Sequence, residues 1–278
     1  MIVVSGDGAT NRLGVYLRAR RELITPERAG IPAGANRRVK GLRREEVALL
    51  AGISPDYYLR LERGRDSNPS AQVLEALARV LELDDVEREY LLGLSAARPR
   101  ARPRRRLPER IPARLHHLLA AIDVPAFIEG RSFDVLASNP LAVALSPRLR
   151  PGQNRLRSLL LDPEERAFHQ NWEASTAAFV AAFRKSVGDE TDDARIVELV
   201  GELSLSSERF RRLWGRHDVR ELEGGSITVN HPVVGTLRLN RDKLPAGPVI
   251  LVLYYPDEGS ESADKLRLLA SLTTDATT

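Results

Sequence analysis

The sequence predicts an α+β protein with an all-helical N-terminal half and a mixed C-terminal half. Up to about residue 95, apolar residues recur at helical spacing without strand-like alternation. After residue 112, short β-rich segments such as residues 249–255 alternate with helical ones. Residues 1–110 hold 22 Arg/Lys and 15 Asp/Glu, whereas residues 111–278 hold 20 and 23. The opposite net charges indicate one half that binds a polyanion and one half with another task.

The composition excludes several classes of protein. Apolar residues make up 42% and charged residues 29% of the 278 positions, as in globular proteins. Without cysteine there is no disulfide framework, thiol nucleophile or thiolate zinc site. We expect no secretory signal, because the first residues show no basic start followed by an apolar core, and no apolar run is long enough to span a bilayer. We therefore expect a cytoplasmic protein that has no contact with membranes.

The N-terminal half, residues 1–97, is expected to be a bundle of five short helices. Ser54 and Ser70 are favoured N-cap residues, and Pro55 is tolerated in a first helical turn. Gly52 is a helix stop, and Asp84 with Asp85 suits the start of the last helix. The expected helices cover residues 13–23, 43–51, 54–64, 70–81 and 84–94.

Residues 98–112 read RPRARPRRRLPERIP. The four prolines prevent a regular helix, so we expect a stiff, extended linker between two domains. Two interpretations stay open. The linker could only separate the domains, or its arginines could also lie along a phosphate backbone and add salt-dependent affinity.

The C-terminal domain, residues 113–278, is expected to hold a central antiparallel sheet. Glycine or proline separates the β-rich segments, which favours hairpins. Asn139 and Pro140 suit the start of a short helix from Leu141. The expected strands are 126–129, 133–137, 226–229, 235–239 and 249–255. The expected longer helices are 162–187, 194–203, 206–216 and 262–272.

Residues 43–64, RREEVALLAGISPDYYLRLERG, have the spacing of a helix-turn-helix motif. Ala48 is small enough for two helices to approach closely. Gly52 can adopt the positive φ of the turn, and Ile53 can fill the corner. Tyr58 is expected to pack inward. The alternative is an ordinary helical hairpin.

Together with Glu62-Arg63-Gly64 and Asn68-Pro69-Ser70, this motif resembles the Cro/repressor-like (XRE) family of DNA-binding domains. The resemblance extends from about Leu13 to Ser95. It implies that the helix from Ser54 to Arg63 enters the major groove of double-stranded DNA. The implied base contacts are Ser54, Asp56, Tyr57 and Arg60. The implied phosphate contacts are Arg43, Arg44, Arg63 and Asn68.

Each of these contacts has a structural alternative. Arg60 suits bidentate hydrogen bonding to a guanine. Asp56 could accept from a cytosine amino group, or its charge could simply favour the helix dipole. The phosphate set could equally be solvated charges or turn caps, and phosphate contacts position a protein without selecting sequence.

The second half resembles the C-terminal domain of MmyB-type regulators. The similar segments are 138–141, 171–173, 203–214, 216–219 and 231–235. The resemblance implies a PAS-like domain that binds a small lipophilic, fatty-acid-like molecule. The family pattern has a more basic run where this chain has residues 227–230, so no ligand contact is assigned there.

Aromatic residues provide the candidate ligand pocket. Phe168, Trp172, Thr176, Phe179 and Phe183 fall on one helical stripe, which could line a pocket or simply pack a helix on the sheet. The predicted pocket residues are Asn139, Trp172, Phe179, Phe183, Phe210, Trp214 and His217.

Catalytic and metal motifs are missing from the sequence. No two histidines have ligand spacing, and neither a nucleophile elbow nor a phosphate-binding loop occurs. We therefore expect no catalytic site, metal or cofactor. The sequence predicts a ligand-responsive transcription regulator that binds DNA as a homodimer. The alternatives are that the second half is an uncharacterised enzyme or only a dimerisation domain.

Overall fold

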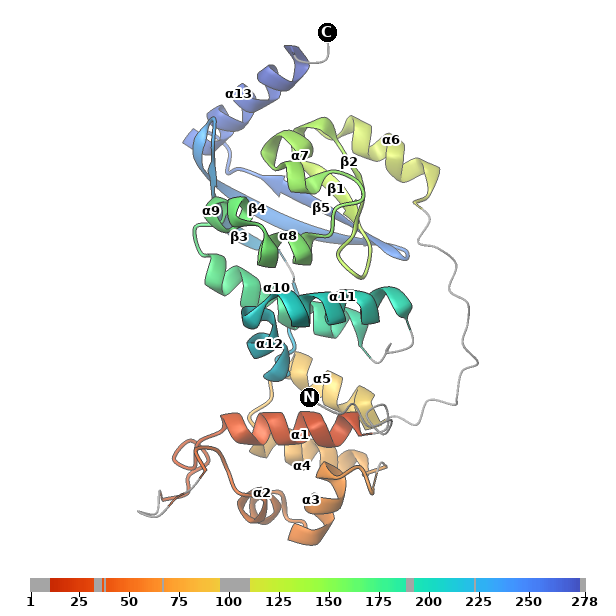
Figure 1. Ribbon diagram of the computed structural model, residues 1–278, viewed down its shortest axis with the longest axis vertical. Coiled ribbons are helices and arrows are strands. Elements are labelled where there is room, and N and C mark those ends of the chain that lie inside the picture. Colours follow the sequence, from red (N-terminus) through yellow and green to blue (C-terminus); the bar gives the residue numbers. More distant parts are fainter. Residues whose placement is uncertain are drawn as a thin grey trace. The chain divides into compact units, whose positions relative to one another are not determined.

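The computed structural model describes residues 11–32, 37, 39–66, 68–95, 111–188, 193–222 and 224–275. The chain divides into two compact units (Figure 1). The N-terminal unit comprises Met1–Pro103 and Arg212–Arg220, and the C-terminal unit comprises Arg104–Arg211 and Glu221–Thr278. Residues 98–110, which make up most of the predicted linker 98–112, lie outside the described residues. Within the described ranges, none of the helices is long and apolar enough to cross a bilayer.

The five helices predicted for the N-terminal half are present. They are α1 (Arg12–Leu23), α2 (Arg44–Ala51), α3 (Pro55–Glu62), α4 (Ala71–Val80) and α5 (Asp85–Ser95). Side chains at helical spacing from all five meet in one core, in which Leu17, Val47, Tyr58, Leu77 and Leu91 are fully buried. Burial of these apolar faces is the main force that holds the short helices together.

Local signals set the helix ends as predicted. The Ser54 hydroxyl accepts from the Tyr57 amide at 3.2 Å, and the Ser70 hydroxyl accepts from the Val73 amide at 3.3 Å. Gly52 ends α2 with a φ of 68°, a conformation that glycine adopts without steric cost. The turn between α2 and α3 therefore has the helix-turn-helix form.

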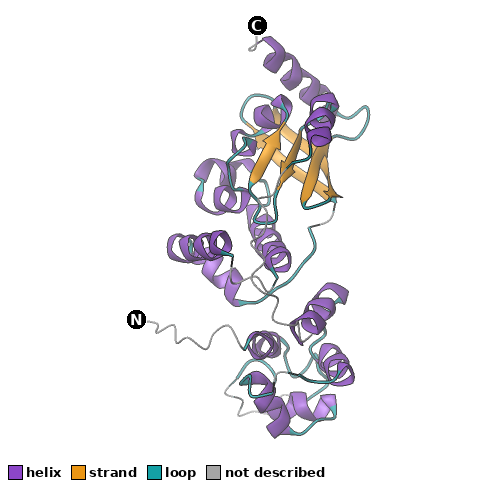
Figure 2. Cartoon of the chain, turned by 90° about the vertical axis from the view of Figure 1, so that its right-hand side faces the viewer, coloured by secondary structure: helices purple, strands orange, loops and turns teal. Residues whose placement is uncertain are grey.

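The C-terminal unit is built on a five-stranded antiparallel sheet, shown in orange in Figure 2. Its strand order is β2-β1-β5-β4-β3. The strands are β1 (Ala126–Glu129), β2 (Val135–Ser138), β3 (Gly225–His231), β4 (Gly235–Ala246) and β5 (Val249–Tyr255). The α+β class and the antiparallel sheet are confirmed. β2 begins later than predicted because Phe133 has a φ of 65° and cannot continue a strand.

Helices cover both faces of this sheet. Phe127 pairs with Val252, and both belong to a core shared with α7 (Pro140–Leu145) and α13 (Glu261–Asp275). The next pair, Ile128 and Leu251, points to the other face and packs with α6 (Ala113–Ala121). The alternation of side chains along each strand produces this two-sided burial.

One helix prediction is wrong. The expected helix over residues 162–187 is split into α9 (Pro163–Phe168) and α10 (Trp172–Val187). His169 forms a bridge with Val229 of β3, and the Gln170 amide donates to the Thr228 carbonyl at 3.2 Å. Asn171 then caps α10. Pairing with the edge strand β3 thus replaces one helical turn, and Phe168 is not on the helix that carries Phe179.

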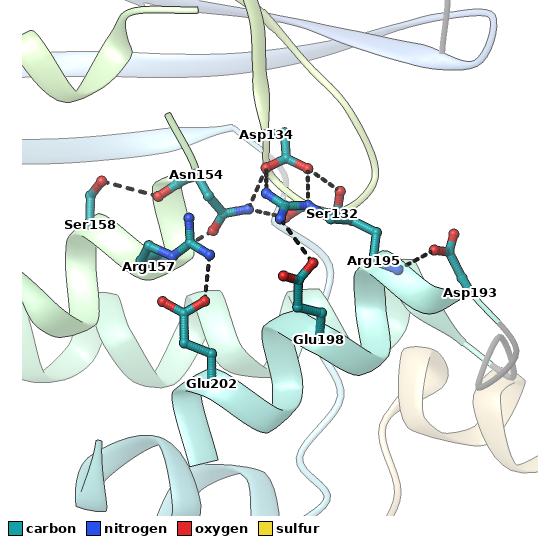
Figure 3. A network of polar contacts seen from close by, with 9 residues as sticks. All are labelled: Ser132, Asp134, Asn154, Arg157, Ser158, Asp193, Arg195, Glu198 and Glu202. Carbon is teal, nitrogen blue, oxygen red and sulfur yellow. Dashed lines mark hydrogen bonds and ion pairs between the residues drawn. The ribbon is translucent and has the colours of Figure 1, made fainter. Parts of the chain in front are cut away.

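Four further helices complete the C-terminal part. They are the 3₁₀ turn η1 (Pro147–Leu149), α8 (Arg155–Leu161), α11 (Ala194–Ser206) and α12 (Glu208–Gly215). Asp134 fixes α11, because its carboxylate receives hydrogen bonds from Arg195 at 2.9 Å, Asn154 at 3.0 Å and Ser132 at 2.6 Å (Figure 3). Arg157 of α8 also pairs with Glu202 of α11. This polar network positions α8 and α11 beside the start of β2.

Candidate functional site

The predicted recognition helix α3 presents two charged side chains to solvent. Asp56 and Arg60 are exposed, whereas Tyr57 is half-buried. The Arg60 guanidinium lies 5.4 Å from the centre of the Tyr57 ring, which is a cation–π contact. Ser54 is exposed, but its hydroxyl accepts the capping hydrogen bond. The four predicted base contacts therefore extend from the N-cap to the last turn of one short helix.

Two buried groups hold α3 in place. Tyr58 is fully buried, as predicted, and burial raises the pKa of its hydroxyl. The Glu62 carboxylate is also buried and binds Arg21 of α1 at 2.6 Å and Arg44 of α2 at 2.5 Å. One carboxylate thereby links three helices. A carboxylate removed from water is stable there only because both oxygens are paired with cations.

The predicted phosphate contacts fall into two groups. Arg43, Arg63 and Asn68 are exposed. Arg44 is half-buried, and its Nε is engaged by Glu62. Arg37, which the sequence reasoning did not single out, binds Glu46 of α2 at 2.6 and 2.5 Å and donates to the Gly41 carbonyl at 2.8 Å. Arg37 thus connects the chain before α2 to α2.

The C-terminal unit contains a cavity of about 30 Å³. Its apolar lining consists of Leu145, Leu149, Leu159, Phe168, Phe179, Ile227 and Val229. Its polar lining consists of Ser146, Arg148, Arg155, Ser158, Glu165, His169 and Tyr254. This free volume holds about two water molecules. The cavity combines a mostly hydrocarbon surface with a cluster of charged groups.

Arg155 is the centre of the charged wall. Its guanidinium carbon lies 4.8 Å from the centres of both the Phe127 and Phe179 rings. It donates to Glu129 at 2.7 Å and to the Tyr254 hydroxyl at 2.8 Å. Lys243 binds the other oxygen of Glu129. Burial alone would raise the pKa of Glu129, but the two cations lower it, so the carboxylate is ionised.

A second carboxylate, Glu165, lies on the cavity wall. The Ser146 hydroxyl donates to one oxygen at 2.7 Å, and the other oxygen is 3.3 Å from Nε2 of His169. Burial would raise the pKa of Glu165, and these two hydrogen bonds together with the charge of Arg155 lower it. The carboxylate therefore lies between the hydroxyl and the imidazole.

Of the predicted pocket residues, Phe179 lines this cavity. Phe183 is buried against Phe133, with ring centres 5.9 Å apart. Trp172 is outside the cavity lining. The guanidinium carbons of Arg166 and Arg209 lie 4.7 and 4.9 Å from the centre of its ring.

The other predicted pocket residues are also elsewhere. Asn139 caps α7 at 2.9 Å and donates to the Val124 carbonyl at 2.7 Å, so its amide is used by the backbone. Phe210 is fully buried in α12, while Trp214 and His217 belong to the N-terminal unit.

Sequence reasoning missed the polar residues of the cavity. Arg155, Glu165 and Tyr254 come from α8, α9 and β5, and no spacing along the chain connects them. One signal was present, because Glu129 is the last residue of the otherwise apolar strand AFIE and a buried carboxylate requires a cation.

Comparison with known families agrees with both units. Residues 12–91 match a family described as a helix-turn-helix domain. Residues 111–269 match the family described as the MmyB-like transcription regulator ligand binding domain. A comparison with curated proteins finds no match. The chain is a DNA-binding transcription regulator with a ligand-binding domain, and it belongs to the MmyB-like family.

Proposed function

We propose that α3 reads an operator sequence through Asp56, Tyr57 and Arg60. The observation that carries this proposal is the pair of solvent-exposed charged side chains on a short helix whose opposite face is fully buried. Arg60 can donate two parallel hydrogen bonds to a guanine, which discriminates against another base by about 1–3 kcal/mol. Ser54, the exposed N-cap residue of α3, contributes to the same contact with the bases. Arg43, Arg44, Arg63 and Asn68 fix the orientation through phosphates.

The protein is proposed to act as a homodimer on a pseudo-palindromic operator. A single helix-turn-helix domain buries too little surface for high specificity, so two half-sites about one helical turn apart increase both affinity and selectivity.

The effector is proposed to be a small, mainly lipophilic molecule with a polar group, such as a fatty acid, bound in the cavity of the C-terminal unit. The apolar lining suits a hydrocarbon chain, and Arg155, Tyr254 and Glu165 supply polar partners at the wall. Ligand pockets usually have volumes of about 300–1,000 Å³. A cavity of about 30 Å³ must therefore expand when a ligand enters, and this expansion is the conformational signal.

The C-terminal unit is proposed to bind its ligand without transforming it. Ser146, Glu165 and His169 are close together, but the carboxylate lies between the hydroxyl and the imidazole. Activation of a serine nucleophile needs the imidazole next to the hydroxyl, so this order of groups does not make a catalytic triad.

Binding of the purified full chain to its own promoter and to a random duplex of equal length tests the first proposal. At one stated salt concentration we expect the promoter to bind at least about a thousandfold more tightly. Equal affinities for the two duplexes would refute sequence-specific recognition. Native mass spectrometry of the protein as purified and melting curves with added decanoate test the effector. If the protein retains no small molecule and decanoate does not stabilise the C-terminal unit, the proposal of a lipophilic ligand is refuted.

A further inference from the structure

The segment Arg212–Arg220 lies within the sequence matched by the ligand-binding family, yet it is part of the N-terminal unit. It contains the motif Arg216-His217-Asp218-Val219, which neither the recognition helix nor the cavity uses. The chain therefore enters the N-terminal unit twice, once with its first five helices and once with these nine residues.

Within the motif, His217 adopts a left-handed conformation. The helix ends at Gly215, and His217 has a φ of 55° while its amide donates to the Trp214 carbonyl at 3.3 Å. Such a conformation stops a helix and turns the chain away from the helix axis. As a result, Asp218 and Val219 do not extend the helix α12.

Asp218 and Val219 attach the segment to the bundle. Val219 is fully buried in the core that contains Leu13, Tyr16 and Leu17 of α1. Asp218 accepts from Arg20 of α1 at 3.0 Å and pairs with Arg216 at 2.9 Å. Arg20 also binds Glu87 of α5 at 2.8 Å, and its side chain is only 11% exposed. A single arginine thus joins the segment to two helices.

The contact with α1 can affect α3. A Cβ built on Gly14 of α1 would lie 2.3 Å from the carbonyl oxygen of Glu62, so the two helices touch through their backbones. Because such close packing leaves no free space, a displacement of α1 displaces the end of α3.

We propose that residues 212–220 complete the DNA-binding unit and are the route by which the C-terminal unit controls it. The segment follows directly on the first half of α12, which belongs to the C-terminal unit. It is followed by Glu221, which binds Lys185 of α10 at 2.9 Å within that unit. A rearrangement of α10 or α12 therefore pulls on both ends of the anchored segment. The inference rests on the proposed recognition of DNA by α3.

The test compares Asp218→Asn and Val219→Ala in the full chain with two matched controls. Asp264→Asn removes an exposed carboxylate of α13, and Val233→Ala truncates an exposed valine. Hydrogen exchange of α1 and α5, and affinity for the promoter, are measured where far-UV circular dichroism shows each variant folded.

We expect Val219→Ala to accelerate exchange in α1 and α5 by about ten- to a hundredfold, because it leaves a cavity in the core. Asp218→Asn is isosteric and should accelerate it by about three- to tenfold. Both variants should weaken promoter binding at least about threefold, and both controls should behave as the wild type.

Two outcomes would overturn the inference. Unchanged exchange in α1 and α5 would show that the segment is not part of the DNA-binding unit. Faster exchange with unchanged promoter affinity would show that the anchor does not control DNA binding. Arg60→Ala separates the two proposals, since it should weaken promoter binding with normal exchange in α1 and α5. If Arg60→Ala has no effect, the proposed recognition of DNA by α3 fails. The exchange data still show in that case whether residues 212–220 are part of the N-terminal unit.

Discussion

Arg155 donates to Glu129 across 2.7 Å inside the C-terminal unit, and both side chains are buried. Each charge is stable there because the other is present. The same guanidinium lies on the cavity wall, so the interior ion pair and the proposed effector site share one residue.

Replacing Arg155 by methionine should destabilise the C-terminal unit strongly. The change leaves a buried carboxylate with Lys243 as its remaining cation, and breaking a buried pair costs about 3–5 kcal/mol. Urea unfolding measures the loss. Arg157→Met is the control, because Arg157 pairs with Glu202 at a partly exposed site where pairs contribute about 0–1 kcal/mol. Equal losses for the two variants would contradict the role of burial.

The stability of the C-terminal unit should fall in acid, partly through Asp134. Burial would raise the pKa of this carboxyl, but hydrogen bonds from Arg195, Ser132 and Asn154 lower it below its ordinary value. A lowered folded-state pKa stabilises the fold fully above the unfolded value of about 4, and this contribution is lost as pH falls through the folded value. Urea midpoints of wild type and Asp134→Asn between pH 7 and pH 3 should therefore converge. A constant difference would show that Asp134 does not contribute through its charge.

Arg60→Ala and Arg43→Ala should affect DNA binding differently. Loss of Arg60 should cost about 1–3 kcal/mol on the promoter and relax selectivity at one base position. Loss of Arg43 should weaken binding to all duplexes by a similar factor and reduce the salt slope by about one. Fluorescence anisotropy with a set of single-base operator variants at two salt concentrations checks both. The same loss on every duplex for both variants would contradict the assignment of Arg60 to a base.

Val229→Phe should block the cavity. Val229 is fully buried on its wall, and a phenyl ring exceeds the free volume of about 30 Å³. We expect this variant to lose the molecule retained on purification and the thermal stabilisation by decanoate, while overpacking costs about 1–3 kcal/mol. The control is Val233→Phe at an exposed position. Normal decanoate stabilisation of a folded Val229→Phe protein would place the ligand elsewhere.

The five-helix bundle and its turn could be predicted from the sequence alone, as could the bounds of β1 and β5, whereas α6 and α8 were not predicted. These features depend on groups within a few residues of one another: the caps at Ser54 and Ser70, the positive φ of Gly52 and the helical spacing of the core. Such interactions have nearly the same energy in any fold, so a short window of sequence is sufficient to predict them.

The sequence did not reveal the cavity, the break at His169 or the contact of Asp218 with the N-terminal unit, because all three depend on residues far apart in the chain. Arg155 and Tyr254 are 99 positions apart, and Arg20 and Asp218 are 198 positions apart. The free energy of these contacts comes from burial and from charges that meet only after folding, and no periodicity in the sequence encodes it. The Arg216–Val219 motif could be recognised in the sequence, but its place in the N-terminal unit could not. That place depends on the burial of Val219 in the core formed by α1 to α5.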